Sequence, residues 1–398
     1  MKSKLLWMSA FLLSALLIGL GISSSAQAQQ VDLTPQEQLG KYLFYDQNLS
    51  LNNNQACAAC HGPGVGYTGP DESINLHGGV YEGSIAGNFG NRKPPAAAYA
   101  GDSPILYYDD ETGWAGGMFW DGRAAGWTMG DPLAEQAKGP FLNPMEQAIP
   151  DAQILCEKVE ASEYVNLFEE VWGSLSCTDD TGVGVAYNDI AISIAAYERS
   201  LEVSSFTSKF DMFWDNAKEK GLDVTQINSM NWSKYRSLGL THEELRGLAV
   251  FNANCSSCHT LDEGTYGYPL FTDFSYDNLG IPKNLENPAT IADPNWADPG
   301  LGGFLMDTAE IGKFKVPTLR NVDLRPFPEF VKAYGHNAYF KSLEEIVHFY
   351  NTRDVQPWPA PEVLANMNTT EIGNLRLNKT QESWIVEFLK TLSDGYIQ

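Results

Sequence analysis

The sequence predicts a mostly helical fold with extensive loops, arranged as two similar domains. Three observations lead to this prediction. The motif Cys-x-x-Cys-His occurs at residues 57–61 and again at 255–259, each time after a segment that is helical in pattern. Stretches rich in glycine, proline and asparagine follow each motif, at 61–104 and 260–303. Runs that alternate apolar and polar residues, as exposed strands do, are few.

Composition and charge exclude some classes of function. The chain has 398 residues, of which 43% are hydrophobic and 19% are charged, so it contains enough apolar material for folded domains. Its 50 Asp and Glu residues against 26 Lys and Arg residues give a formal net charge of −24. Because so acidic a surface repels phosphate backbones, we expect no nucleic-acid partner.

The first 28 residues are typical of a cleavable export signal. Lys2 and Lys4 precede an apolar run from Leu5 to Leu20, and a small-residue cleavage site follows at 26–28. We expect cleavage before Gln29, with an uncleaved membrane anchor as the alternative. No later apolar run is long enough to cross a bilayer, so we expect a periplasmic protein without a membrane span after cleavage.

Two helix starts precede the two motifs. Residues 34–37 (Thr-Pro-Gln-Glu) combine a capping threonine, a proline at the first helical position and a glutamate three residues after the cap. Residues 241–244 (Thr-His-Glu-Glu) form a second such capping box. Each signal predicts a helix that leads to the following Cys-x-x-Cys-His motif, through Leu39 and Leu43 in the first half and through Leu245 and Leu248 in the second.

The segment between the two halves sets the domain boundary. Residues 189–201 are helical in pattern, with Ile190, Ile194 and Tyr197 on one face. Residues 216–240 are polar and irregular, and we interpret them as an inserted loop. We place the boundary near 203–206, which gives a signal peptide at 1–28, an N-terminal domain at 29–204 and a C-terminal domain at 205–398.

The cysteine motifs indicate haem attachment. Two thiols three positions apart can add to the two vinyl groups of one haem, and the next residue, a histidine, then directs a nitrogen at the iron. The alternatives are a redox dithiol, which needs no histidine, and a zinc site, which needs a fourth ligand. We predict two covalent haem c groups in two cytochrome c-like domains, with both histidines as iron ligands. The attaching residues are Cys57, Cys60, His61, Cys255, Cys258 and His259.

Two cysteines remain outside these motifs. Cys156 and Cys177 are 21 residues apart, and an oxidising compartment favours a disulfide between them, worth ~3 kcal/mol. The alternative is a pair of buried free thiols.

Further motifs make the chain similar to a known family. Leu-Phe-Tyr-Asp at 43–46 precedes the first haem motif, and Phe-Trp-Asp-Gly-Arg-Ala follows it at 119–124. The second half contains Phe-Lys-Val-Pro-Thr-Leu-Arg-Asn-Val at 314–322, then His336 and the segment 343–350. In this order the motifs resemble the bacterial di-haem cytochrome c peroxidase superfamily, which includes MauG-type enzymes. The resemblance implies that peroxide binds at the N-terminal haem and that electrons enter through the C-terminal haem.

The resemblance also implies catalytic residues. The family places a glutamine and, ten residues later, a glutamate over the open face of the first haem, and Gln136 and Glu146 keep this spacing. A carboxylate can move a proton between the two oxygens of peroxide, while an amide can hold the outer oxygen. Trp120 matches the tryptophan that the family places between the haems, where it could carry an electron. A structural core tryptophan is the alternative.

The sequence departs from the family at the first haem in two ways. Many members carry a histidine that caps this haem, a few residues before a stretch that corresponds here to residues 91–95. His77 lies too far upstream for that place, so we expect a five-coordinate or water-bound haem without reductive activation. Lys93 stands where the family has an asparagine of a calcium site between the domains. Calcium is therefore doubtful there, although possible elsewhere on the acidic surface.

The second haem needs another iron ligand. The family supplies it fourteen residues after the histidine that corresponds to His336, and this position is Tyr350. Tyr350 shares a helix face with Leu343, whereas His348 lies about 150° away around the helix. Tyrosine here is the MauG-type choice and favours oxidised iron. The alternative is a buried core tyrosine, with Met306 or no residue on the iron.

Three functions follow from these expectations. The first is a peroxidase that reduces hydrogen peroxide with electrons from a small donor protein, a cytochrome c or a cupredoxin, which the acidic charge predicts to be basic. The second is a MauG-like oxidase that modifies a protein substrate with stored oxidising equivalents. The third is an electron-transfer cytochrome without catalysis, which would not need the polar pair Gln136 and Glu146. A homodimer is possible.

Overall fold

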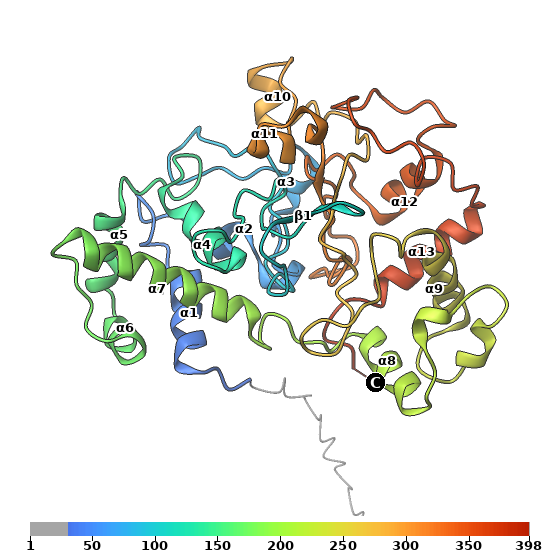
Figure 1. The fold of residues 1–398 in the computed structure, drawn as a ribbon, viewed down its shortest axis with the longest axis horizontal. Helices are drawn as coiled ribbons and strands as arrows, with labels where there is room; N and C mark the ends of the chain where they lie inside the picture. The colour runs from blue at the N-terminus through green and yellow to red at the C-terminus, as the bar shows by residue number, and fades with distance from the viewer. Residues whose placement is uncertain (1–30, 398) are drawn as a thin grey trace, which may run out of the picture. The chain divides into compact units, whose positions relative to one another are not determined.

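The fold is mostly helical with long irregular connections, as the sequence predicts (Figure 1). The computed structural model describes residues 31–397, so the expected signal peptide at 1–28 lies outside the described residues. The structure also contains two pairs of short antiparallel strands that the sequence does not reveal. Strand β1 (Tyr107–Asp109) pairs with β2 (Gly113–Ala115), and β3 (Tyr276–Asp277) pairs with β4 (Phe314–Lys315). The helices are α1 (Pro35–Tyr45), α2 (Cys57–Cys60), α3 (Glu72–Leu76), α4 (Pro132–Leu142), α5 (Ala152–Glu160), α6 (Val165–Trp172), α7 (Asp180–Arg199), α8 (Lys209–Glu219), α9 (His242–Asn254), α10 (Pro288–Ala292), α11 (Leu301–Leu305), α12 (Leu343–Thr352) and α13 (Lys379–Lys390), with 3₁₀ turns η1 (Pro63–Val65), η2 (Val224–Gln226), η3 (Trp232–Tyr235) and η4 (Thr308–Glu310).

The two helix starts are confirmed. The Thr34 hydroxyl accepts a hydrogen bond from the Glu37 backbone N–H, and the Glu37 carboxylate accepts one from the Thr34 backbone N–H. Thr241 and Glu244 form the same reciprocal pair at the start of α9. Such a pair satisfies two N–H groups that a helix start leaves free. Helices α1 and α9 therefore begin at corresponding places before the two cysteine motifs.

Each of these helices crosses a later helix at a glycine. A Cβ atom on Gly40 of α1 would lie 1.9 Å from the Ser193 carbonyl oxygen of α7. A Cβ atom on Gly247 of α9 would lie 1.9 Å from the Trp384 carbonyl oxygen of α13. Only glycine permits such close approach of two helix backbones. Figure 1 shows both pairs, α1 with α7 and α9 with α13. The repeated crossing agrees with two cytochrome-like halves.

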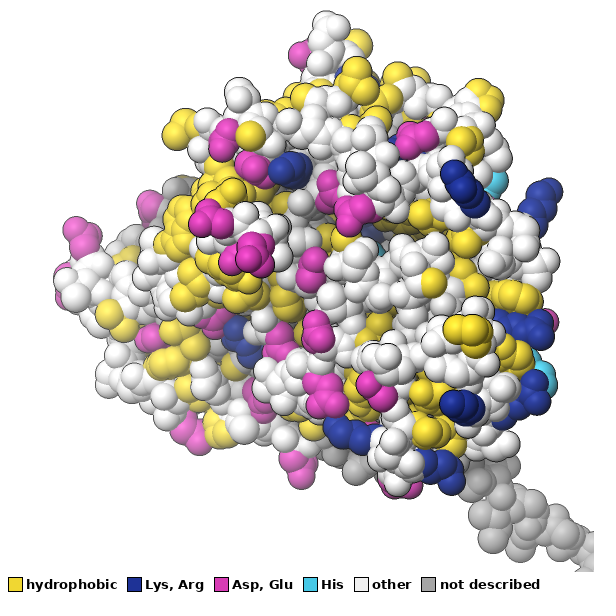
Figure 2. Space-filling model, turned by 45° about the vertical axis from the view of Figure 1, so that its right-hand side comes forward, with side chains coloured by type: hydrophobic (Ala, Val, Ile, Leu, Met, Phe, Trp, Pro, Cys, Tyr) yellow, Lys and Arg dark blue, Asp and Glu magenta, His cyan; other side chains and the backbone are white. Residues whose placement is uncertain are grey.

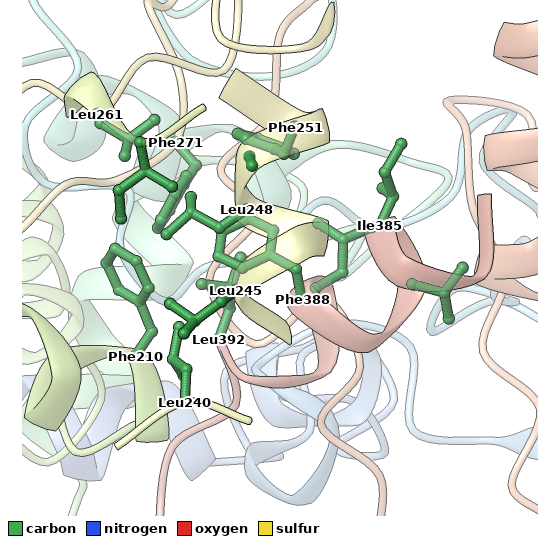
Figure 3. Packing of buried hydrophobic residues seen from close by; sticks show 14 of the residues in the cluster. Phe210, Leu240, Leu245, Leu248, Phe251, Leu261, Phe271, Ile385, Phe388 and Leu392 are labelled. Atoms are coloured by element: carbon green, nitrogen blue, oxygen red, sulfur yellow. The ribbon is translucent and has the colours of Figure 1, made fainter. Parts of the chain in front are cut away.

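The hydrophobic core has two main clusters. The first is built mainly from α1, α5, α6 and α7, and the second mainly from α8, α9, α12 and α13. Figure 3 shows part of the second cluster, in which Phe210, Leu248, Phe251, Phe271 and Phe388 point toward one another. The rings of Phe251 and Phe388 lie 5.0 Å apart. Each cluster includes residues next to one Cys-x-x-Cys-His motif.

Two expectations about the middle of the chain can be refined. Residues 216–219 belong to the end of α8, and residues 220–240 are irregular, as expected, with only the 3₁₀ turns η2 and η3. However, Val224, Ile227, Tyr235 and Leu238 of this segment are buried in the second cluster. Their spacing follows no helical or strand period, so the pattern conceals their burial. Helix α7 begins at Asp180, nine residues before the predicted start at 189, because the Asp179 carboxylate caps it.

Two further expectations can be compared with the structure. Cys156 and Cys177 form the predicted disulfide, with their Cα atoms 5.8 Å apart. Within residues 31–397, no helix is both long and apolar enough to cross a membrane.

Candidate functional site

Two large cavities are each walled by one cysteine motif. Cys57, Cys60 and His61 line the first cavity. Cys255, Cys258 and His259 line the second. The empty space, including the open mouth, is about 1470 Å³ in the first cavity and about 1100 Å³ in the second. Cavities of this size accommodate cofactors.

Both motif histidines are held in the same tautomer. The His61 Nδ1 atom lies 3.0 Å from the Tyr67 carbonyl oxygen, and the His259 Nδ1 atom lies 2.8 Å from the Phe271 carbonyl oxygen. Because a carbonyl oxygen only accepts, Nδ1 must carry the hydrogen and donate it. Burial also lowers the pKa of both imidazoles, which favours the neutral ring. Each Nε2 atom therefore keeps a lone pair for a metal.

The cysteines of the two motifs are free thiols. Neither Cys57 with Cys60 nor Cys255 with Cys258 forms a disulfide, in contrast to Cys156 with Cys177. Each cavity thus contains two thiols and one imidazole with an available nitrogen. This donor set fits a c-type haem, which needs two thioether links and an axial histidine.

Gln136 and Glu146 line the first cavity together with the motif. Gln136 lies on α4, whose start is capped by the Asp131 carboxylate. Glu146 follows α4 in a tight turn, in which its backbone N–H donates to the Asn143 carbonyl oxygen at 3.0 Å. The Ser84 N–H donates to the Glu146 carbonyl oxygen at 2.6 Å, so a second loop holds this turn in place. The structure therefore brings the predicted pair to one cavity.

The electrostatics of the Glu146 carboxyl suit proton transfer. Burial raises its pKa, while the Arg123 guanidinium and the Asn143 side chain act in the opposite direction. A carboxyl whose pKa is raised binds a proton more readily, which suits a group that accepts a proton and then returns it.

Trp120 lines both large cavities. Its indole N–H donates to the Lys93 carbonyl oxygen at 2.8 Å, and its carbonyl oxygen accepts from the Lys315 N–H at 2.9 Å. These bonds fix the ring between a loop of the first half and strand β4 of the second. Trp120 is thus placed where the two cavities approach each other.

The structure also shows where His77 and Lys93 lie, the two residues discussed above as departures from the family pattern. The His77 side chain is exposed and lies 3.5 Å from the Glu286 carboxylate, away from the lining of the first cavity. The buried Lys93 ammonium donates to the Thr68 hydroxyl at 2.8 Å and to the Pro94 carbonyl oxygen at 3.1 Å. Burial lowers its pKa to about 8. Within residues 31–397, no three His, Cys, Asp or Glu side chains are grouped to hold a metal ion.

Tyr350 lines the second cavity from helix α12. Burial raises the pKa of its hydroxyl, so the neutral form is favoured without a nearby cation. His348 points elsewhere and contacts the Glu382 carboxylate at 3.0 Å. Met306, the alternative to Tyr350, is 92% exposed and does not line this cavity.

His336 also lines the second cavity, although it belongs to a loop. Its Nε2 atom lies 3.1 Å from the Glu362 carboxylate, and its ring stacks on Phe314 at 3.5 Å. Its carbonyl oxygen accepts from the Lys93 N–H at 2.8 Å. These contacts hold the His336 loop in place beside the second cavity.

Sequence reasoning missed Glu198. This side chain lines the first cavity from α7 and is only 4% exposed. Its Oε2 atom has no hydrogen-bond partner among the described residues, and burial raises its pKa to about 8. The available signal was its position four residues after Ile194, on the apolar face of a predicted helix.

The fold and the two cavities define a class of protein, the di-haem cytochromes. A family model described as "Di-haem cytochrome c peroxidase" matches residues 34–219. The chain is 32% identical to the methylamine utilization protein MauG of Paracoccus denitrificans over 375 residues, which cover 89% of this chain and 88% of that protein. It is 28% identical to cytochrome c551 peroxidase of Nitrosomonas europaea over 361 residues, which cover 89% of this chain and 79% of that protein.

A solved structure gives the same result. The diheme peroxidase BthA of Burkholderia thailandensis superposes with a TM-score of 0.72 at 27% sequence identity, and the match covers 92% of this chain and 87% of that one. The chain therefore belongs to the di-haem cytochrome c peroxidase family, whose members include both peroxidases and MauG proteins.

Proposed function

We propose that the protein reduces hydrogen peroxide to water with electrons from a small redox protein. One observation carries this proposal: a single cavity gathers Cys57, Cys60 and His61 together with the polar pair Gln136 and Glu146. A pure electron carrier does not need such a pair beside its haem. Each peroxide takes two electrons and two protons and gives two water molecules.

The two cavities would each hold one haem, and we assign them to domains divided between residues 204 and 205. Cys57 and Cys60 would form the thioether links of the first haem, with His61 as the iron ligand. Cys255, Cys258 and His259 would do the same in the second cavity. When bound, the haem irons would supply the redox chemistry of the reaction.

We propose that Tyr350 is a second protein ligand, beside His259, of the iron in the second cavity. Burial disfavours its phenolate, so ionisation requires a cation in this cavity, as an iron would provide. An oxygen ligand from a tyrosine favours the oxidised metal. The second cavity would then serve electron transfer, while the first keeps an open position.

Glu146 and Gln136 would handle protons and orientation. The Glu146 carboxylate would take the proton from one oxygen of peroxide and return it to the other, so that the O–O bond breaks and the second oxygen leaves as water. Two electrons supplied by the haems and two further protons would convert the remaining oxygen into the second water molecule. The raised pKa of this carboxyl supports both halves of the exchange. The Gln136 amide donates a hydrogen bond to the outer oxygen and orients it.

Trp120 would connect the two sites. Its ring lines both cavities, and its hydrogen bond to the Lys93 carbonyl oxygen holds it there. We propose that electrons received at the second cavity pass this ring on their way to the first. The expected export signal would place the reaction in the periplasm.

A MauG-like oxidase is the second candidate function. The position of Tyr350 in the second cavity favours it, and so does the 32% identity to MauG of Paracoccus denitrificans. Such a protein would keep the oxidising equivalents taken from peroxide and use them on a protein substrate, rather than on a donor.

Steady-state kinetics separate these candidates. The wild-type protein should oxidise a reduced, positively charged small c-type cytochrome in the presence of peroxide. Glu146→Gln should lower kcat at least ~100-fold, because a general acid–base group is lost. Glu170→Gln, which changes an exposed glutamate in α6, is the matched control and should leave kcat unchanged. Retained oxidising equivalents with negligible turnover would favour the oxidase, and no reaction with peroxide would refute both.

A further inference from the structure

We propose that four aromatic side chains, here named the aromatic patch, form the docking surface for a basic electron-donor protein. The patch consists of Tyr108, Trp114, Trp127 and Phe304. This inference rests on the proposed peroxidase function and names the surface by which the donor engages the protein.

The patch consists of two ring pairs, both at least partly open to solvent. Tyr108 is 56% exposed and Trp127 is 57% exposed, whereas Trp114 and Phe304 are partly exposed. The rings of Tyr108 and Trp114 lie 5.4 Å apart, and those of Trp127 and Phe304 lie 5.7 Å apart. Trp114 and Phe304 pack on one buried cluster, which joins the two ring pairs. Exposed aromatic groups of this kind mark protein interfaces.

The exposed Trp127 is held rigidly. Its indole N–H donates to the Leu106 carbonyl oxygen at 2.9 Å. The Glu135 carboxylate accepts from the backbone N–H groups of Gly126, Thr128 and Met129, at 2.6 to 2.8 Å, and so fixes both sides of Trp127. A fixed ring loses little conformational freedom on binding, which favours a role in recognition over an accidental exposure.

The surroundings of the patch are acidic. Residues 104–117, 124–137 and 299–310 contain no Lys or Arg. Asp109 is the last residue of β1, Asp110 and Glu111 lie in the turn between β1 and β2, and Asp307 follows α11; all four are exposed. Hydrogen bonds from backbone N–H groups of the turn lower the pKa of Asp109 and keep it ionised.

The acidic charge around the patch favours a basic partner protein. Apolar rings bordered by carboxylates complement a partner whose apolar contact is bordered by Lys and Arg. A second copy of this chain would bring the same carboxylates against one another, which disfavours self-association here. On the face drawn in Figure 2, yellow apolar groups border magenta carboxylates at the left, and the dark blue cations lie mainly toward the right and lower edges.

The patch lies next to the wall of the second cavity. Leu106, Ala125, Tyr276 and Leu301 form the buried cluster beneath it. The next residue of β3, Asp277, lines the second cavity, because adjacent strand residues face opposite sides. Strand β3 thus separates a partner on the patch from this cavity. Proximity to the site of electron entry favours an electron donor as the partner.

Calorimetric binding of a ferric, positively charged small c-type cytochrome tests the inference. The wild-type protein should bind it, and Trp127→Ser and Tyr108→Ser should each raise Kd at least tenfold, as expected for central aromatic residues of an interface. Asp110→Lys should weaken binding several-fold. Met230→Ser, which changes a side chain that is 90% exposed outside the patch, should leave Kd unchanged.

Turnover with two reductants separates this inference from the proposed function. With the cytochrome as reductant, kcat/KM of Trp127→Ser and of Tyr108→Ser should fall at least tenfold, because KM rises. With the neutral reductant hydroquinone, the peroxide turnover of the same variants should not change. Unchanged binding in both patch variants, or a wild type that turns over hydroquinone but binds no basic cytochrome, would overturn the docking surface alone. No peroxide turnover with either reductant would overturn the proposed function.

Discussion

Replacing Glu198 with glutamine should stabilise the folded protein much more at alkaline pH than at acid pH. The buried Glu198 carboxyl has a pKa of about 8, compared with an ordinary value of 4.5. Between pH 4.5 and about pH 8, the carboxyl is protonated in the folded protein and ionised in the unfolded chain, so unfolding releases a proton. The stability of the wild type therefore falls as the pH rises. Each pH unit is worth ~1.4 kcal/mol, which gives about 4 kcal/mol between pH 5 and pH 8. Glutamine does not ionise, so the variant lacks this loss.

Guanidinium denaturation of the holoprotein at pH 5 and pH 9, followed by circular dichroism, measures the effect. The free energy of unfolding of Glu198→Gln relative to the wild type should be higher at pH 9 than at pH 5 by about 4 kcal/mol. The control Glu160→Gln, at an exposed position of α5, should show no such difference. An equal effect of Glu198→Gln at both pH values would refute the reasoning.

Three further predictions address other parts of the structure. Asp211→Ala should destabilise the protein by about 3–5 kcal/mol in denaturation experiments, because the fully buried Arg320, 2.6 Å from Asp211, would lose its carboxylate partner; a loss below 1 kcal/mol would contradict this. Tyr350→Phe should change the ferric absorption spectrum of one haem and leave the other unchanged, and an unaltered spectrum would exclude Tyr350 as a ligand. The double variant Cys57→Ser with Cys60→Ser should retain one covalent haem instead of two in mass spectra of the denatured protein, and two retained haems would exclude this attachment site.

The parts of the fold that depend on neighbouring residues were predictable. The capping boxes at Thr34 and Thr241 involve contacts over three residues, and both helices start where the sequence predicts. The disulfide between Cys156 and Cys177 followed from the few cysteines left outside the motifs. The placement of Gln136 and Glu146 at one cavity was predictable because their spacing matches the family pattern.

The parts that depend on distant contacts were not predictable. Glu198 lies on the wall of the first cavity because α7 packs against α1 and α4. Its place on the apolar face of α7 indicates burial, but not the cavity that it lines. The strand pair β1–β2 is only three residues long on each side, too short for an alternating signal. Val224 and Leu238 are buried by contacts with α8 and α9 rather than by a regular pattern of their own.

Rapid mixing of the ferric protein with one equivalent of hydrogen peroxide tests most directly whether the first cavity is the peroxide site. Absorption spectra recorded after mixing should show a fast change at one haem in the wild type and a change at least ~100-fold slower in Glu146→Gln. An equal rate in the variant, or no spectral change in the wild type, would contradict the assignment of Glu146 and of its cavity to peroxide chemistry.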